Sequence, residues 1–135
     1  MSARTLKNCL VVSRDGGNRQ VEYVLQEKGF SLIPSGNGQE GVAALGRFKP
    51  KMIILFFNPE DQDDILVLRA VQAVFQERYF EIRAVIISPD VKATARLLGK
   101  AAKNRHCTVL PDWSNRRALA RLECLENMGR VIGGR

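Results

Sequence analysis

The chain of 135 residues lacks the usual marks of a disulfide-linked, zinc-binding or membrane-spanning protein. Its 3 cysteines, Cys9, Cys107 and Cys124, are odd in number and have no CxxC spacing, which disfavours a disulfide framework or a zinc site. No apolar run reaches the roughly 18 residues that suggest a transmembrane helix. The first residues, Met1 to Lys7, also lack the apolar segment of a signal peptide. We therefore expect a cytoplasmic protein that does not contact a membrane.

Motifs for catalysis and for nucleotide binding are also missing. Gly16 and Gly17 belong to neither of the glycine-rich phosphate loops. His106 is the only histidine and lies beside Cys107, but a Cys–His nucleophile needs an orienting group and an accessible thiol. A buried free thiol is the far more common state of a cysteine in an apolar run. Because no acid–base constellation is evident, we expect no enzyme activity, no cofactor and no metal.

What the chain does have is an uneven distribution of charge. Residues 1–90 contain 11 Lys/Arg and 11 Asp/Glu, so their formal charges cancel. Residues 91–135 contain 10 Lys/Arg and 3 Asp/Glu, and 10 − 3 gives the whole formal net charge of +7. A basic segment of this kind indicates an acidic partner or a nucleic acid.

One stretch indicates the centre of the fold. Met52 to Phe57 are six consecutive apolar residues between Lys51 and the pair Asn58-Pro59. A short apolar run without alternation is typical of a parallel strand that is buried on both faces. Open α/β sheets bind ligands at the carboxyl ends of their strands. This strand brings no carboxylate to that end.

Four further apolar runs alternate with helical patterns. The expected strands are 8–12, 30–33, 52–57, 82–87 and 107–110, and the expected helices are 18–28, 39–47, 60–77, 91–102 and 115–127. Such alternation predicts parallel βα units with right-handed crossovers, and hence a three-layer α/β/α sandwich around a five-stranded parallel sheet. We assign residues 1–7 and 129–135 to terminal tails and 8–128 to a single domain.

Three local features carry further expectations. Pro34 should end the second strand, because proline donates no ladder hydrogen bond. Gly41 and Gly46 lie within a predicted helix, and close helix–sheet packing would explain why they are tolerated. The acids in the segment 60–64 suit a helix start on a solvated face; the spacing of a calcium-binding loop is absent.

The residues also resemble the receiver domain of bacterial two-component response regulators, over nearly the whole chain. The segment Gly29–Glu40 is similar to the family's second strand and its Asn-Gly-x-Glu helix entry. The segments Cys9–Val12, Lys49–Leu55 and Val85–Ser88 match the first, third and fourth strands. The resemblance implies a flavodoxin-like sheet of order 2-1-3-4-5, with the Met52–Phe57 stretch in the middle.

The same resemblance shows that most of the family's phosphorylation residues are replaced. Ser13 and Arg14 stand where the family has an acidic pair that holds Mg²⁺. Phe56, or Leu55 in an alternative alignment, replaces the phosphoacceptor aspartate. Pro111 occupies the position of the lysine that binds the phosphoryl group, and only Ser88 is retained.

These replacements remove the chemistry of aspartate phosphorylation. That reaction needs a carboxylate nucleophile, a divalent cation and a cation for the product. Mg²⁺ requires hard oxygen ligands, whereas Arg14 would place a positive charge at the metal position. The sequence therefore resembles a degenerate receiver, a pseudo-receiver, that works without phosphorylation.

The basic C-terminal third supplies a candidate interaction face. Lys92, Arg96, Lys100 and Lys103 recur at i+4, i+4 and i+3, which predicts one stripe on a single helix. In a receiver-like fold this helix adjoins strand five and helix five, the face that family members use for docking and dimerisation. The full predicted face contains Lys92, Arg96, Lys100, Lys103, Arg105, Trp113, Arg116 and Arg117.

Several interpretations of this face remain open. It could bind a protein partner with an acidic surface, form a homodimer, or be no more than a solvated basic surface. Trp113 is either a packing residue or an exposed anchor. Binding of RNA or DNA is the alternative function, because clustered cations neutralise phosphates. Against it, no nucleic-acid motif is present and aromatic residues do not interleave with the basic ones.

Overall fold

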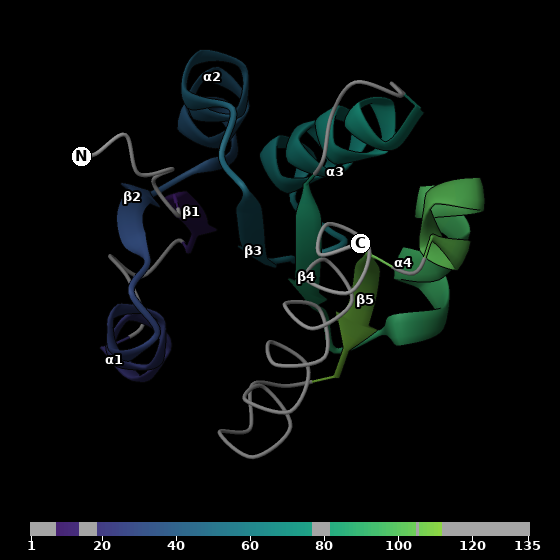
Figure 1. Ribbon diagram of the computed structural model, residues 1–135. Helices are drawn as coiled ribbons and strands as arrows, with labels where there is room; N and C mark the ends of the chain where they lie inside the picture. Colours follow the sequence, from purple (N-terminus) through teal and green to yellow (C-terminus); the bar gives the residue numbers. More distant parts are fainter. Residues whose placement is uncertain (1–7, 14–18, 77–81, 105, 112–135) are drawn as a thin grey trace, which may run out of the picture.

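The computed structural model describes residues 8–13, 19–76, 82–104 and 106–111 (Figure 1). These residues form strands and helices in strict alternation. In chain order they are β1 (Asn8–Val12), α1 (Arg19–Glu27), β2 (Ser31–Ser35), α2 (Gly38–Phe48), β3 (Met52–Phe56), α3 (Gln62–Gln76), β4 (Arg83–Ile87), α4 (Val91–Leu98), the 3-10 helix η1 (Gly99–Lys103) and β5 (Cys107–Leu110). Within this part of the chain, no helix is both long and apolar enough to cross a membrane.

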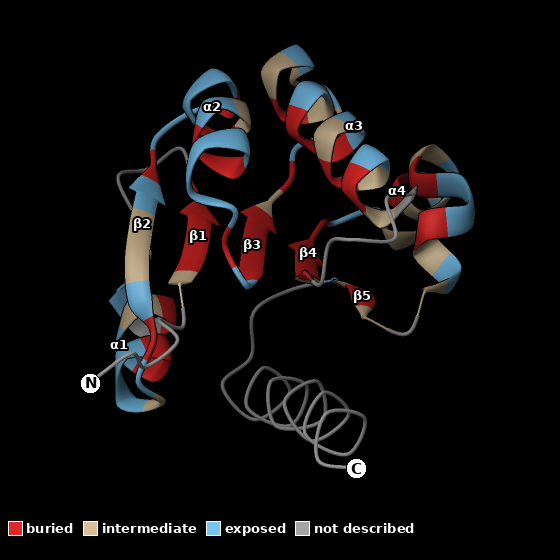
Figure 2. Cartoon of the chain, turned by 45° about the horizontal axis from the view of Figure 1, so that its top comes forward, coloured by how far each residue is buried: buried red, intermediate tan, exposed pale blue. Residues whose placement is uncertain are grey.

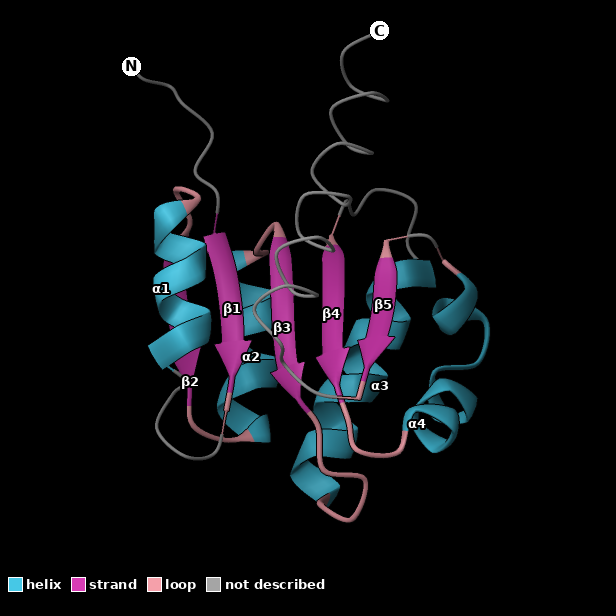
Figure 3. Ribbon diagram, turned by 90° about the horizontal axis from the view of Figure 1, so that it is seen from below, coloured by secondary structure: helices cyan, strands magenta, loops and turns pink. Residues whose placement is uncertain are grey.

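The five strands form one parallel sheet of order β2-β1-β3-β4-β5 (Figure 3). β3 pairs with β1 through Val12 and Leu55 and with β4 through Phe56 and Ile87. The predicted strand order and the central place of β3 are therefore confirmed. The predicted fifth helix, 115–127, and both predicted tails lie outside the described residues.

Helices cover both faces of the sheet, and alternate residues of each strand point to opposite sides. Leu10, Ile53 and Ile86 pack in one buried cluster with residues of α2, α3 and α4. Val11 and Ile54 belong to a second cluster that includes residues of α1. Figure 2 shows β1, β3 and β4 as largely buried, whereas most of β2, at the sheet edge, is intermediate or exposed. Continuous apolar strands are required here because both of their faces are covered.

The prediction that Pro34 ends the second strand is wrong. β2 continues to Ser35, and Pro34 lies opposite Val11 in the parallel register. β2 is an edge strand, so it needs ladder hydrogen bonds on one side only. Proline is tolerated at such a position because its nitrogen can face away from the sheet.

The helix predicted over 91–102 is shorter than expected. α4 ends at Leu98, and Gly99 has a φ of 62° that favours glycine. The chain then continues as the 3-10 helix η1, and the buried positions of this segment are Thr94, Leu98 and Ala101. The Gln72 side chain of α3 donates to the Leu98 carbonyl at 3.0 Å, which satisfies a group that the helix end leaves open.

Glycines in α2 allow close packing at two positions. A Cβ at Gly41 would lie 3.1 Å from Val12 Cγ2, so the predicted close helix–sheet contact is confirmed there. The same prediction is wrong for Gly46, which has no atom within 4 Å of an added Cβ. Gly38 is the tightest position, because an added Cβ would overlap the backbone carbonyl of Asp63. The first turns of α2 and α3 can approach each other only with glycine at this position.

Candidate functional site at the carboxyl end of the sheet

The ends of the strands hold the predicted pocket residues close together. The parallel ladder continues one step beyond each strand: Ser13 donates its N–H to the Ser35 carbonyl at 3.0 Å and Phe57 to the Ile87 carbonyl at 2.8 Å. Ser88 donates to the Leu110 carbonyl at 2.9 Å. Ser13, Phe56 and Ser88 therefore share one edge of the sheet, followed after β5 by the exposed Pro111. Arg14 lies outside the described residues.

Two phenylalanines occupy the end of β3 and point to opposite faces. Phe57 is buried, with 3% of its surface exposed, in the cluster formed with α2, α3 and α4. Phe56 is partly buried and packs against the cluster on the α1 side. Leu55, the other aligned candidate for the phosphoacceptor position, is fully buried. Hydrocarbon thus stands at the end of the central strand in either alignment.

Ser88 is fully buried, and its hydroxyl forms hydrogen bonds with residues at the start of α4. Ser88 Oγ donates to the Asp90 carbonyl at 3.3 Å and accepts the Asp90 N–H at 3.2 Å. Thr94 Oγ1, also fully buried, lies 2.7 Å from Ser88 Oγ. Because each hydroxyl has one proton, Thr94 donates to Ser88 when Ser88 donates to Asp90. Sequence reasoning missed Thr94, although a hydroxyl residue four positions after Asp90 suits a helix start.

The loop between β3 and α3 is closed by its own hydrogen bonds. The Asn58 N–H donates to Asp64 Oδ2 at 2.9 Å, and the Asp64 N–H donates to Asp61 Oδ1 at 2.9 Å. Asp64 is only 2% exposed, so the prediction that residues 60–64 lie on a solvated face is wrong for this carboxylate. Within the described part of the chain, no group of three or more His, Cys, Asp and Glu residues is placed to hold a metal ion.

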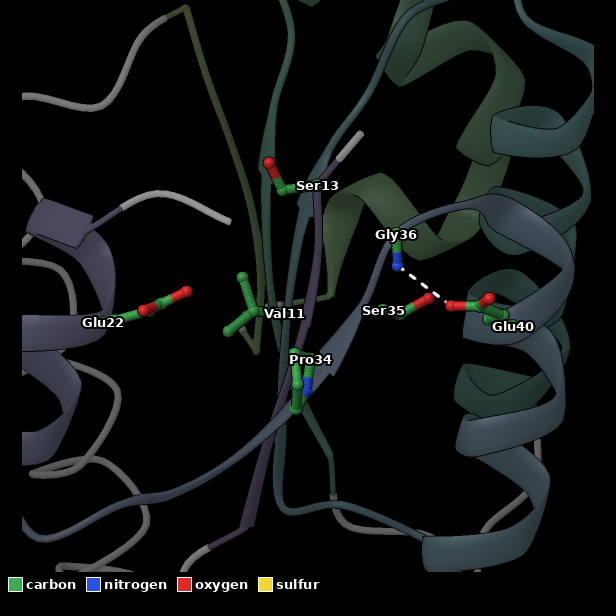
Figure 4. A pocket seen from close by; sticks show the side chains of 7 residues that line it. All are labelled: Val11, Ser13, Glu22, Pro34, Ser35, Gly36 and Glu40. Atoms are coloured by element: carbon green, nitrogen blue, oxygen red, sulfur yellow. Dashed lines mark hydrogen bonds between the residues drawn. The ribbon is translucent and has the colours of Figure 1, made fainter. Parts of the chain in front are cut away.

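A cavity of about 270 Å³ lies beside this edge, at the ends of β1 and β2 (Figure 4). Its lining includes Val11 and Ser13 of the first strand region, Pro34 at the end of β2, and two glutamates, Glu22 and Glu40. Glu40 Oε1 accepts the Gly36 N–H at 3.1 Å, drawn as the dashed line in Figure 4. The sequence showed no signal for this cavity, because it depends on how α1 and α2 pack beside the sheet.

The predicted interaction face is only partly described. Lys92 and Arg96 lie exposed on α4, and Lys100 and Lys103 lie exposed on η1. The prediction that all four form a stripe on one α-helix is wrong. α4 ends at Leu98, and residues 99–103 form a 3-10 helix, which has fewer residues per turn. The other members, Arg105, Trp113, Arg116 and Arg117, lie outside the described residues.

The described cysteines are buried thiols. Burial raises the pKa of Cys107 to about 12 and raises that of Cys9 as well. A raised pKa favours the protonated thiol, which is a poor nucleophile. The geometry therefore gives no support to a Cys–His reaction at His106 and Cys107.

Comparisons with known proteins support the fold but not a family assignment. No family model matches the chain, and no curated protein matches it. A CheY-like response regulator receiver domain from Methanospirillum hungatei JF-1 has a TM-score of 0.67 and 13% identity, covering 93% of this chain and 98% of that one. The signal receiver domain of a protein described as a Luxo repressor from Vibrio parahaemolyticus has a TM-score of 0.58 and 14% identity, covering 94% and 98%.

A chain fused to the trimeric coiled coil of yeast Spc42 also matches, with a TM-score of 0.67 and 14% identity, over 97% of this chain and 88% of that one. Identities this low show the fold alone. The chain has a receiver-like fold.

Proposed function

We propose that this chain is a phosphorylation-independent receiver-like module of bacterial signal transduction, which acts in the cytoplasm by binding a protein partner. The observation that carries the proposal is the end of β3. In a receiver-like sheet, this is where the strand order reverses and where ligand chemistry is usually placed. Here it presents Phe56 and buries Phe57.

A carboxylate and a hydroxyl of the kinds found in a phosphorylation site are present near the end of β3, but both already have structural roles. Asp64 is a buried carboxylate after β3, but it accepts the Asn58 N–H at the start of α3. Ser88 is bonded to Asp90 and Thr94. Among the residues that the structure describes, no carboxylate lies beside a cation site, so this part of the chain offers no route to an aspartyl phosphate. The chain would then transmit a signal only by binding its partner.

The exposed cations of α4 and η1 make a suitable docking surface. Lys92, Arg96, Lys100 and Lys103 fall within 91–103, a segment that contains no acidic residue. An acidic protein surface would be attracted to it, mainly through a faster association rate. The second candidate partner is a nucleic acid. The same set of cations, with no acidic residue between them, favours it. Binding to phosphates would weaken steeply with salt, by about one counterion per contact.

The test is affinity capture from the native host with charge-reversed variants. Changing Lys92, Arg96 and Lys100 to glutamate should abolish capture of the partner. Changing Arg19, Arg47 and Lys51 to glutamate alters the net charge equally at exposed positions elsewhere, and should leave capture intact. Equal loss in both variants, or loss of the thermal transition in the first alone, would contradict a docking role for α4 and η1.

The same preparations separate protein from nucleic acid. If the partner is a protein, capture should survive nuclease treatment. Capture that disappears with nuclease, together with a steep salt dependence of an electrophoretic shift, would replace the protein partner with a nucleic acid.

A further inference from the structure

The cavity at the ends of β1 and β2 contains a polar group that the fold leaves unused. Ser13 is 8% exposed, and its N–H is held by the Ser35 carbonyl at 3.0 Å. Its hydroxyl makes no hydrogen bond to any other residue that the structure describes. The Ser13 hydroxyl lines the cavity and is therefore available to a ligand.

A carboxylate faces the same space. Glu22 lies in the first turn of α1 and is half-buried, and Figure 4 shows its side chain directed toward Val11. No cation among the described residues forms an ion pair with it. Glu40 lines the cavity from the start of α2, where one of its oxygens holds the Gly36 N–H. Both charged groups among the described lining residues are therefore anionic.

The rest of the described lining is Val11, Pro34, Gly36 and Ser35, whose hydroxyl already donates to the Asn37 carbonyl at 2.8 Å. Val11 and Pro34 are paired across β1 and β2, so their side chains lie on one face and form a floor between the polar groups. A volume of about 270 Å³ is at the small end of ligand sites. The space fits a short molecule with a hydrocarbon body and a positively charged end.

We infer that this cavity binds a small organic cation, namely a short aliphatic amine or diamine. Its ammonium group donates hydrogen bonds to the Glu22 carboxylate and to Ser13 Oγ, which gives each a charge-assisted or polar partner. Its methylene chain covers Val11 and Pro34 and removes their apolar surface from water. In a diamine, the second ammonium lies toward the Glu40 side. The site shares only Ser13 with the pocket predicted from the receiver resemblance, and the inference does not rest on the docking proposal.

The test uses 1,4-diaminobutane as the probe, in calorimetric titration and in amide chemical-shift mapping. We expect saturable binding to the wild-type chain, with shifts confined to the ends of β1 and β2 and the start of α1. Glu22→Gln keeps the shape and removes the charge, and should weaken binding about 10-fold or more, the size of one charge-assisted contact. Ser13→Ala should weaken it several-fold.

Two controls make the outcome decisive. Glu27→Gln removes the same charge from an exposed position at the end of the same helix and should leave the affinity unchanged. 1-Butanol has the same chain without the ammonium and should bind much more weakly. No binding of the diamine at about 10 mM, equal binding of the alcohol, or equal weakening by Glu27→Gln would overturn the inference. Failure here leaves the docking face untouched, because that face is tested by capture of the partner.

Discussion

The carboxyl ends of β3 and β4 are hydrogen-bonded neighbours, yet they finish in opposite ways. β3 ends in Phe56 and the buried Phe57, whereas β4 ends in Ser88, whose hydroxyl is bonded to Asp90 and Thr94. Phe57 and Ser88 are both buried. Hydrocarbon closes the end of β3, whereas hydroxyl groups bond the end of β4 to the start of α4. The comparison teaches that neighbouring strand ends can be closed by different chemistry, and that the hydrogen bonds of Ser88 give it a structural role.

The two loops that follow these strands are alike, because side-chain hydrogen bonds close both of them. After β3, the loop is closed by Asn58, Asp61 and Asp64. After β4, it is closed by Ser88, Asp90 and Thr94, with the Asp90 side chain accepting the Ala93 N–H at 3.0 Å. Asp61 and Asp90 thus cap the helices that follow, and Asp64 closes the loop before α3.

The largest expected effect tests the hydrocarbon end of β3. Phe57→Ala should lower the free energy of unfolding by about 3–5 kcal/mol, because it leaves a cavity in the core between the sheet and α2, α3 and α4. Phe56→Ala should cost clearly less, because Phe56 is only partly buried. Urea denaturation of the two variants measures the difference. Equal losses would contradict the unequal burial of the two rings.

A smaller effect tests the hydroxyl tie of β4. Ser88→Ala and Thr94→Val should each lower the free energy of unfolding by about 1–2 kcal/mol, because each removes the 2.7 Å hydrogen bond between the two buried hydroxyls. The double variant should lose less than the sum, since the two hydroxyls share one bond. Denaturation of all four proteins gives the coupling energy. Strict additivity would show that the contact between the two oxygens does not stabilise the fold.

Much of the fold was predictable because its signals are local. The continuous apolar runs specify strands that are buried on both faces, and β5 begins and ends as expected at Cys107 and Leu110. Turn residues such as Asn37 specify a helix start, which the structure confirms by the bond from the Glu40 N–H to Asn37 Oδ1 at 2.9 Å. Alternation of the elements then limits the topology to very few arrangements.

The errors share a different cause. The predicted end of β2 at Pro34 is wrong because a strand tolerates proline when it lies at the edge of the sheet. The position of a strand in the sheet is a property of the whole fold. Asp64 was assigned to a solvated face because the burial of one side of α3 and its bond to Asn58 depend on how that helix packs. The end of α4 is the exception, since Gly99 is a local stop signal that sequence reasoning passed over.

The candidate site also has one part that could be expected from the sequence and one part that depends on packing. The resemblance to receivers led to the expectation of hydrocarbon at the phosphoacceptor position, which stays a prediction; the structure shows that Phe56 ends β3 at that edge. The cavity lined by Ser13, Glu22 and Glu40 could not, because these residues come from three elements far apart in the chain. Binding sites assembled from several elements require the packing before they can be recognised.

The most direct test of the account is exposure of the chain to Mg²⁺ with acetyl phosphate or beryllofluoride, alongside a receiver domain that has intact acidic residues. Intact mass and the thermal melt are measured for both proteins. The account predicts an adduct and stabilisation for the control, with no mass change and no shift of the melting temperature for this chain. A phosphoryl adduct on this chain, or stabilisation that requires Mg²⁺, would contradict the claim that its receiver-like fold works without phosphorylation.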